Sequence, residues 1–180
     1  MKACGKTTVG SLLASKLKIR FIELDDELEK EHQKLKNEHL TFRQIFKKYG
    51  EKYFRQLETE TLLKLSKNLD TANFVFACGG GTPLLAKNQA ILKKLGKIIY
   101  LKVDSDVLLQ RIIKDGIPAF FADPANPQQS LVELLKKREP IYHKLADILI
   151  KLDKETPEEV IDKIMQLHNF VQNDDLERDV

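Results

Sequence analysis

Short apolar runs that alternate with amphipathic segments constrain the fold of this 180-residue chain more than any other feature. Strands that alternate with helices predict a parallel sheet with helices on its faces and ligands at the carboxyl ends of the strands. We therefore expect one α/β domain over residues 1–170, followed by a polar tail over 171–180. The predicted strands are IRFIEL (19–24), NFVFA (73–77), KIIYLKV (97–103) and DILIKL (147–152).

Capping patterns predict where several helices begin and end. Thr41 and Gln44 fit a capping box, and Gly50 fits the end of the helix that follows it. Near the C-terminus, Thr156 and Glu159 with an intervening proline indicate another helix start. Residues 116–129, GIPAFFADPANPQQ, are rich in Pro, Gly and Asn and interrupt the pattern, which predicts a mobile lid loop over about 115–128.

The composition indicates a globular protein that can bury a core, and it excludes a disordered chain. A formal net charge of +3 is too small to indicate nucleic-acid binding. No apolar stretch is long enough to span a bilayer and no signal segment follows Met1, so we expect a cytoplasmic protein without a membrane partner. Two cysteines without C-x-x-C spacing and four dispersed histidines predict free thiols rather than a metal site.

The sequence Gly5-Lys6-Thr7 matches the G-K-[ST] end of a P-loop and stands directly before a predicted amphipathic helix. Backbone N–H groups of such a turn bind phosphate, the lysine reaches the β and γ oxygens, and the Thr hydroxyl binds Mg²⁺. An ordinary glycine turn is the alternative. We predict that ATP and Mg²⁺ bind here, with Thr7 as a magnesium ligand. The residues predicted to contact the nucleotide are Lys2, Ala3, Cys4, Gly5, Lys6, Thr7 and Thr8.

The P-loop pattern also requires an earlier glycine, which would fall one position before Met1. A P-loop follows a buried strand, and no apolar strand precedes Met1. We therefore expect the natural protein to continue upstream with a short apolar strand and a glycine. On this interpretation Met1 is an internal residue.

Four further segments resemble those of one family. FIELDDELE, GEKYFRQLE, CGGGTPL and KKREPIY occur in the order and approximate spacing seen in shikimate kinases, and the resemblance covers nearly the whole chain. These are small P-loop kinases that phosphorylate a hydroxyl of a cyclic carboxylic acid. The resemblance implies a P-loop NTPase-like parallel sheet with a lid. It also implies ATP-dependent phosphorylation of the 3-hydroxyl of shikimate in aromatic amino-acid biosynthesis, and we expect a monomer.

The resemblance implies a role for each matching residue. Asp25 would contact the acceptor hydroxyls and orient or deprotonate the nucleophile. Glu23 occupies a position where the family usually has an aspartate, close to the magnesium ion and its water shell. A helix cap or a solvated charge is the alternative for Asp25. Lys6 would act with Asp25 in catalysis. The turn Gly79-Gly80-Gly81 would lie beneath the substrate.

Four more positions match residues that bind the two substrates. Arg55 and Arg138 would hold the substrate carboxylate, since guanidinium groups bind carboxylates with two parallel hydrogen bonds. Surface ion pairs with neighbours such as Glu58 and Glu139 are the alternative. Arg111 would lie against the adenine, with Pro157 on the other side of the base.

The lid departs from the family pattern. Ile117 occupies the position of an arginine that closes over the phosphates. An arginine in this role contributes ~10³-fold or more to phosphoryl transfer, so compensation or low activity is expected. Lys2 and Lys114 are the candidates for a replacement positive charge. Two other functions stay open: another small-molecule kinase of the gluconate type, and a catalytically silent relative that binds nucleotide or metabolite.

Overall fold

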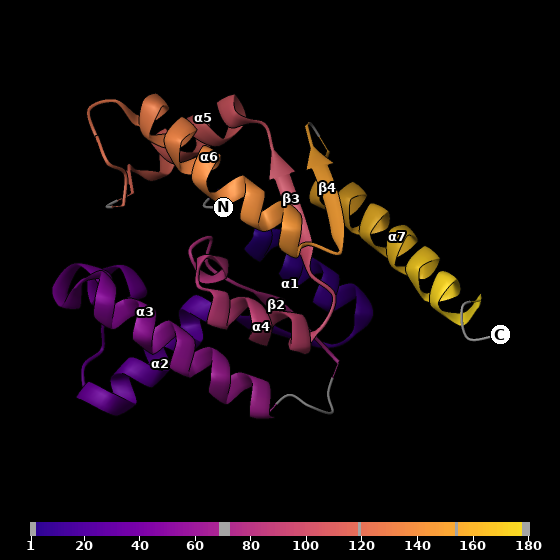
Figure 1. Ribbon diagram of the computed structural model, residues 1–180, viewed down its shortest axis with the longest axis horizontal. Helices are drawn as coiled ribbons and strands as arrows, with labels where there is room; N and C mark the ends of the chain where they lie inside the picture. The colour runs from indigo at the N-terminus through magenta and orange to yellow at the C-terminus, as the bar shows by residue number, and fades with distance from the viewer. Residues whose placement is uncertain (1–2, 69–72, 119, 154, 178–180) are drawn as a thin grey trace.

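The computed structural model describes residues 3–68, 73–118, 120–153 and 155–177 (Figure 1). Helices and strands alternate as predicted, so the expectation of an α/β fold is confirmed. The strands are β1 (Arg20–Glu23), β2 (Phe74–Ala77), β3 (Ile99–Val103) and β4 (Ile148–Leu152). The α-helices are α1 (Lys6–Leu17), α2 (Leu24–Lys36), α3 (Phe42–Asn68), α4 (Ala86–Leu95), α5 (Ser105–Asp115), α6 (Pro127–Leu145) and α7 (Pro157–Glu177), and the 3₁₀-helix η1 covers Thr82–Leu84.

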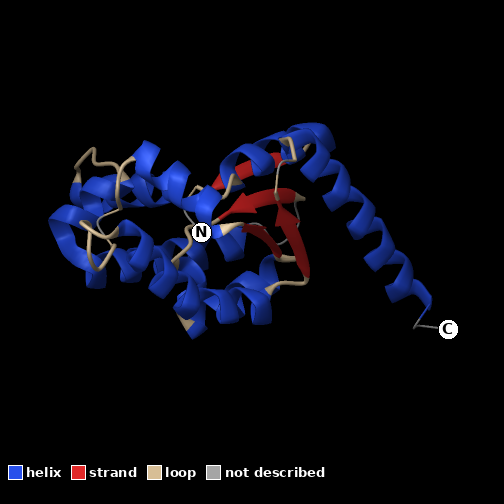
Figure 2. Ribbon diagram, turned by 90° about the horizontal axis from the view of Figure 1, so that it is seen from above, coloured by secondary structure: helices blue, strands red, loops and turns tan. Residues whose placement is uncertain are grey.

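The strands form two parallel pairs that share one core. β1 pairs with β2, with Ile22 opposite Phe76, and β3 pairs with β4, with Leu101 opposite Ile150. Within the described residues no backbone ladder joins β2 to β3. A buried apolar cluster nevertheless connects α1, β3, β4, α5 and α7, and Val75 of β2 packs against it. Figure 2 shows the strands lying between the helices. The expectation of an upstream strand stays a prediction.

The helices divide into groups on either side of the strands. α2 and α3 pack on each other around a second cluster that includes Leu28, Ile45 and Phe54, and they lie together at the lower end of Figure 1. α5 and α6 lie together at the opposite end. α7 packs against α1 and β4 at its start and then projects from the body. It continues to Glu177, through most of the segment expected to be a tail, because that segment contains no glycine or proline.

The predicted caps are confirmed. Thr41 and Gln44 exchange hydrogen bonds as a capping box, with the Thr41 N–H donating to Gln44 Oε1 at 2.8 Å. Thr156 and Glu159 do the same at the start of α7, where the corresponding distance is 2.8 Å. Each exchange satisfies backbone N–H groups that have no partner inside the helix. α6 begins earlier than expected, at Pro127, because the side chain of Asn126 accepts a hydrogen bond from the Gln129 N–H.

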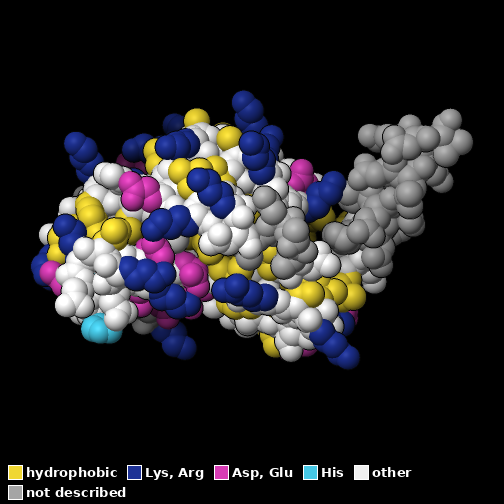
Figure 3. Space-filling view, turned by 90° about the horizontal axis from the view of Figure 1, so that it is seen from below, with side chains coloured by type: hydrophobic (Ala, Val, Ile, Leu, Met, Phe, Trp, Pro, Cys, Tyr) yellow, Lys and Arg dark blue, Asp and Glu magenta, His cyan; other side chains and the backbone are white. Residues whose placement is uncertain are grey.

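Surface charges of the two signs are interspersed. On the face shown in Figure 3, basic and acidic side chains lie next to one another, with apolar side chains between them. On α2, Glu31 forms ion pairs with both Lys34 and Lys64. Among the described residues, no helix combines the length and the apolar content that a membrane span requires.

The substitution Gly50→Ala is expected to destabilise the fold by about 1–2 kcal/mol. Gly50 interrupts α3 with φ 79° and ψ 172°, a conformation that a residue with a Cβ rarely adopts, as its assignment to a helix end anticipated. Urea unfolding followed by circular dichroism measures the change. Lys52→Ala, an exposed position two residues later, is the control and should change the stability by less than about 0.5 kcal/mol. Equal stability of the Gly50 variant and the wild type would contradict the prediction.

Candidate active site

The predicted phosphate-binding turn leads directly into α1. Gly5 has φ 86° and precedes the first helical residue, and Ala3 has a positive φ of 61°. No described side chain caps this end of α1, which leaves the N–H groups of the first turn able to bind an anion. Arg111 of α5 lies beside the turn, because its Nη1 donates a hydrogen bond to the Ala3 carbonyl at 3.2 Å. Lys2 lies outside the described residues.

Two carboxylates face the start of α1. The Thr7 hydroxyl donates to Glu23 Oε2 at 2.7 Å, which joins the helix start to the end of β1. Burial, followed by the negative charge of Glu23, raises the pKa of Asp25 to about 6, although the nearby positive charge of Lys6 opposes this shift. Burial also raises the pKa of Glu23, against the hydrogen bond from Thr7. The structure therefore brings Lys6, Thr7, Glu23 and Asp25 together.

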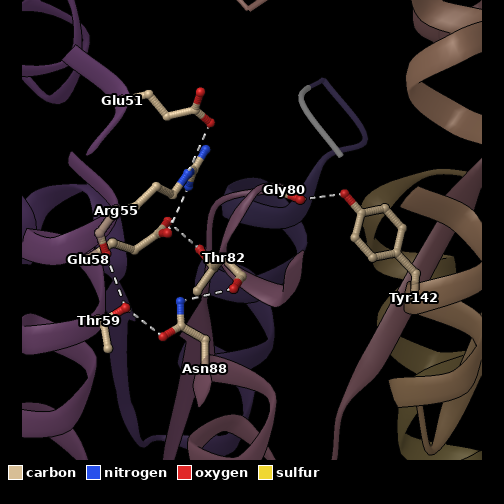
Figure 4. Close-up of polar contacts among 8 residues, drawn as sticks. All are labelled: Glu51, Arg55, Glu58, Thr59, Gly80, Thr82, Asn88 and Tyr142. Atoms are coloured by element: carbon tan, nitrogen blue, oxygen red, sulfur yellow. Dashed lines mark hydrogen bonds and ion pairs between the residues drawn. The ribbon is translucent and has the colours of Figure 1, made fainter. Parts of the chain in front are cut away.

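The triple-glycine turn lies next to both Asp25 and Arg55. A Cβ placed on Gly79 would lie 3.7 Å from Asp25 Oδ1, and a Cβ on Gly81 would lie 2.7 Å from Arg55 Nη1. Only glycine allows the guanidinium of Arg55 to pack this closely on the backbone at position 81. A carboxylate thus lies beside the first glycine of the turn and a guanidinium group beside the last. Figure 4 shows Arg55 at the turn.

A buried hydrogen-bond network holds Arg55 and the glycine turn. Glu58 is 1% exposed; it accepts from Arg55 Nη1 at 2.7 Å and from the Thr82 hydroxyl at 2.7 Å (Figure 4). The Asn88 amide donates to the Thr82 carbonyl at 3.0 Å and accepts from the Thr59 hydroxyl at 2.9 Å. The ion pair of Arg55 with Glu58, which was the alternative interpretation of Arg55, therefore exists, and it also holds the turn. The sequence signal for this role was only the spacing of three residues between an Arg and a Glu on one helix.

Arg138 lies on α6, one helical turn before Tyr142. It is 6% exposed, and its buried Nε has no hydrogen-bond partner within the described residues. The ion pair with Glu139 that was its alternative is not formed, since Glu139 pairs with Lys102 at 3.0 Å. One helical turn after Arg138, the Tyr142 hydroxyl donates to the Gly80 carbonyl at 2.5 Å and ties α6 to the turn.

Sequence reasoning left Tyr142 outside the site, although it ends the R-x-P-x-Y pattern that carries Arg138. Burial raises the pKa of Tyr142 to about 12, so its hydroxyl stays protonated and remains a donor at neutral pH. The spacing of four residues places Tyr142 and Arg138 on one face of α6. That spacing was the available signal, but only the fold shows that Gly80 lies opposite.

The remaining candidates lie in the lid, on α5 and at the start of α7. Residues 116–118 and 120–126 are not helical, in agreement with the predicted loop. Ile117 is 37% exposed and Lys114 is exposed on α5. Pro157 starts α7 and is half-buried. No described contact joins Pro157 to Arg111, so their joint role at the adenine stays a prediction.

Replacement of Glu58 by alanine is expected to destabilise the protein by about 3 kcal/mol. The substitution leaves Arg55 and the buried Thr82 hydroxyl without their acceptor, which costs more than the pair itself contributes. The measurement is the free energy of unfolding in urea. Glu60→Ala, at an exposed position two residues further along α3, should change it by less than about 0.5 kcal/mol. A loss below about 1 kcal/mol for the Glu58 variant would show that the network does not support the fold.

Known proteins share the fold and about a third of the sequence of this chain. The family model of shikimate kinase matches residues 2–169. The shikimate kinase of Alkaliphilus oremlandii is 36% identical over 164 residues, which cover 91% of this chain and 92% of the relative. The solved structure of shikimate kinase from Acinetobacter baumannii in complex with shikimate has a TM-score of 0.81 and 34% identity, covering 94% of this chain and 88% of that one. The structure from Aquifex aeolicus has a TM-score of 0.73 and 32% identity, covering 96% and 94%. The chain therefore belongs to the shikimate kinase family.

Proposed function

We propose that this protein transfers the γ-phosphoryl group of ATP to the 3-hydroxyl of shikimate. The observation that carries the proposal is the placement of Asp25 beside Gly79 and of Arg55 beside Gly81, with Asp25 also near Lys6 at the phosphate-binding turn. This arrangement offers an acceptor for a hydroxyl proton, a cation for a carboxylate and a phosphate site in one place. The similar shikimate kinase from Acinetobacter baumannii was solved in complex with shikimate, which supports the same substrate for this protein.

Asp25 acts on the attacking hydroxyl in this proposal. As the hydroxyl oxygen forms its bond to the γ-phosphorus, the bond from phosphorus to the leaving oxygen of ADP breaks, and the hydroxyl proton passes to Asp25. Lys6 contributes positive charge near the oxygens of the transferred group. A carboxylate with a pKa of about 6 is ionised at neutral pH and is a stronger base than an ordinary aspartate.

Arg55 and Arg138 bind the carboxylate of shikimate. Glu58 holds Arg55 against Gly81, which reduces the conformational freedom that the side chain loses on binding. Tyr142 holds the glycine turn from the side of α6. The turn itself presents no side chains, so the ring of the substrate is able to approach its backbone.

Mg²⁺ fits the oxygen atoms at the start of α1. Thr7 Oγ1 and Glu23 Oε2 lie 2.7 Å apart, and a hard cation of this kind prefers such donors. Within the described residues no group of three or more His, Cys, Asp or Glu forms a metal cage, which suits an ion held mainly by phosphate oxygens and Thr7. When bound, Mg²⁺ neutralises phosphate charge. Glu23 would then accept from the water shell of the ion.

The nucleotide occupies the turn from Lys2 to Thr8 in this proposal, with Arg111 and Pro157 at the adenine. The hydrogen bond from Arg111 to Ala3 supports the first of these two placements. We propose that the enzyme acts as a monomer. We place the enzyme in the cytoplasm, where ATP is available.

A coupled assay of ADP release tests the proposal. We expect turnover with shikimate and ATP and none with gluconate. Arg55→Lys should raise the KM for shikimate at least tenfold, about 1.4 kcal/mol, with a smaller effect on the KM for ATP, since lysine forms no bidentate pair. Arg43→Lys, at an exposed position of the same helix, is the control and should leave both values unchanged. Shikimate binding without turnover would instead support the silent relative that Ile117 in the lid suggests.

Activity should fall as the pH decreases through about 6. Asp25 must be ionised to accept the proton, and it becomes protonated below its pKa of about 6. A pH profile of kcat/KM for shikimate should therefore show an acidic limb near this value. Asp25→Asn should lower kcat at least ~10²-fold. A flat profile between pH 5 and 8, or an active Asn variant, would exclude Asp25 as the base.

A further inference from the structure

Arg138 packs against an aromatic ring of the lid. The guanidinium carbon lies 5.1 Å from the centroid of the Phe120 ring, within the range of a cation–π interaction. Arg138 is buried, and its Nε has no hydrogen-bond partner within the described residues. The ring of Phe120 therefore lies beside a buried charged group, which also interacts with the Tyr142 hydroxyl on its own helix.

Contacts of the neighbouring lid residues leave the Phe120 ring beside Arg138. Its neighbour Phe121 is 5% exposed and belongs to the main apolar core, and the Phe121 N–H donates to the Pro118 carbonyl at 3.1 Å. Further along, the buried Ser130 hydroxyl donates to the Asp123 carbonyl at 2.8 Å and accepts from the Asp123 N–H at 3.0 Å. The bonds between Asp123 and Ser130 attach the lid to α6, and the burial of Phe121 attaches it to the core. Phe120, at 41% exposed, is left outside the core, with Arg138 as its cationic neighbour.

We propose that Phe120 is a positioning residue that couples the lid to the carboxylate-binding Arg138. This inference rests on the proposed function. A guanidinium group binds a carboxylate through its N–H edge and an aromatic ring through its face, so both contacts are able to exist together. The ring restricts the orientation of Arg138 and excludes water from one face. The coupling is reciprocal. Shikimate bound to Arg138 stabilises the lid conformation in which Phe120 contacts Arg138, and this conformation in turn strengthens shikimate binding.

The contact of Phe120 with Arg138 gives the lid a role in shikimate binding although Ile117 replaces the lid arginine. Ile117 brings no charge to the phosphates, whereas Phe120 acts on the other substrate. A lid that only excludes water would need an apolar side chain at 120, and leucine would serve as well as phenylalanine. A lid that positions Arg138 needs an aromatic ring at position 120, because the guanidinium group packs on the π face of that ring. The two roles therefore predict different outcomes for the same substitution.

The first test compares Phe120→Leu with Phe120→Tyr. Loss of the π face should raise the KM for shikimate about three- to tenfold and leave the KM for ATP and the melting temperature close to the wild type, whereas tyrosine should restore the KM for shikimate. Val132→Ala, at an exposed position on α6, is the control for a general effect of apolar truncation. A leucine variant with wild-type kinetics in an enzyme that turns over shikimate would overturn this inference and leave the proposed function intact.

The second test uses the absence of tryptophan from the chain. Phe120→Trp introduces a single indole at the contact, and its emission should change when shikimate is added without ATP. Emission of this variant should also differ from that of Phe120→Trp combined with Arg138→Met before any ligand is present. Identical spectra of the two variants would refute the contact. If the wild type does not turn over shikimate, the coupling falls with the proposed function, while the ligand-free spectra still decide the contact.

Discussion

A buried carboxylate on α3 holds the substrate side of this protein together. Glu58 accepts hydrogen bonds from Arg55 on its own helix and from Thr82 at the start of η1, and a second set of bonds continues to Asn88 on α4. A buried charge is costly unless it is paired, so the fold is stable only when Arg55 and Thr82 are in place. The interaction that stabilises the packing of α3 on η1 and α4 therefore also positions a guanidinium at the glycine turn.

The same turn is held from the opposite side by Tyr142. Its hydroxyl binds the Gly80 carbonyl, while Arg138 lies one turn away on the same helix. Two elements distant in sequence, α3 and α6, thus hold the glycine turn, and each carries one of the two arginines. Arg55 pairs with the buried Glu58 as well as with the exposed Glu51, and the exposed pair by itself would be weak and screened by salt.

The two carboxylates that face the start of α1 are close together and partly buried, which is electrostatically unfavourable. Asp25 is partly buried and lies near Glu23, and both effects raise its pKa to about 6, with Lys6 limiting the shift. Such a group costs stability at neutral pH, because it is ionised where water and counter-charge are limited. This cost is typical of residues that serve chemistry rather than folding.

The sequence by itself determined the order of strands and helices, the two capping boxes, the helix end at Gly50 and the family. These features depend on local periodicity, on backbone N–H groups that lack partners, and on short motifs, all of which are encoded by neighbouring residues. The start of α1 and the candidates Asp25, Arg55 and Arg138 also followed from motifs. The partners of these residues were not predictable in the same way. Only the tertiary structure decided that Thr82 binds Glu58, that Tyr142 reaches Gly80 and that Phe120 covers Arg138, because each of these contacts joins segments whose proximity depends on how the helices pack.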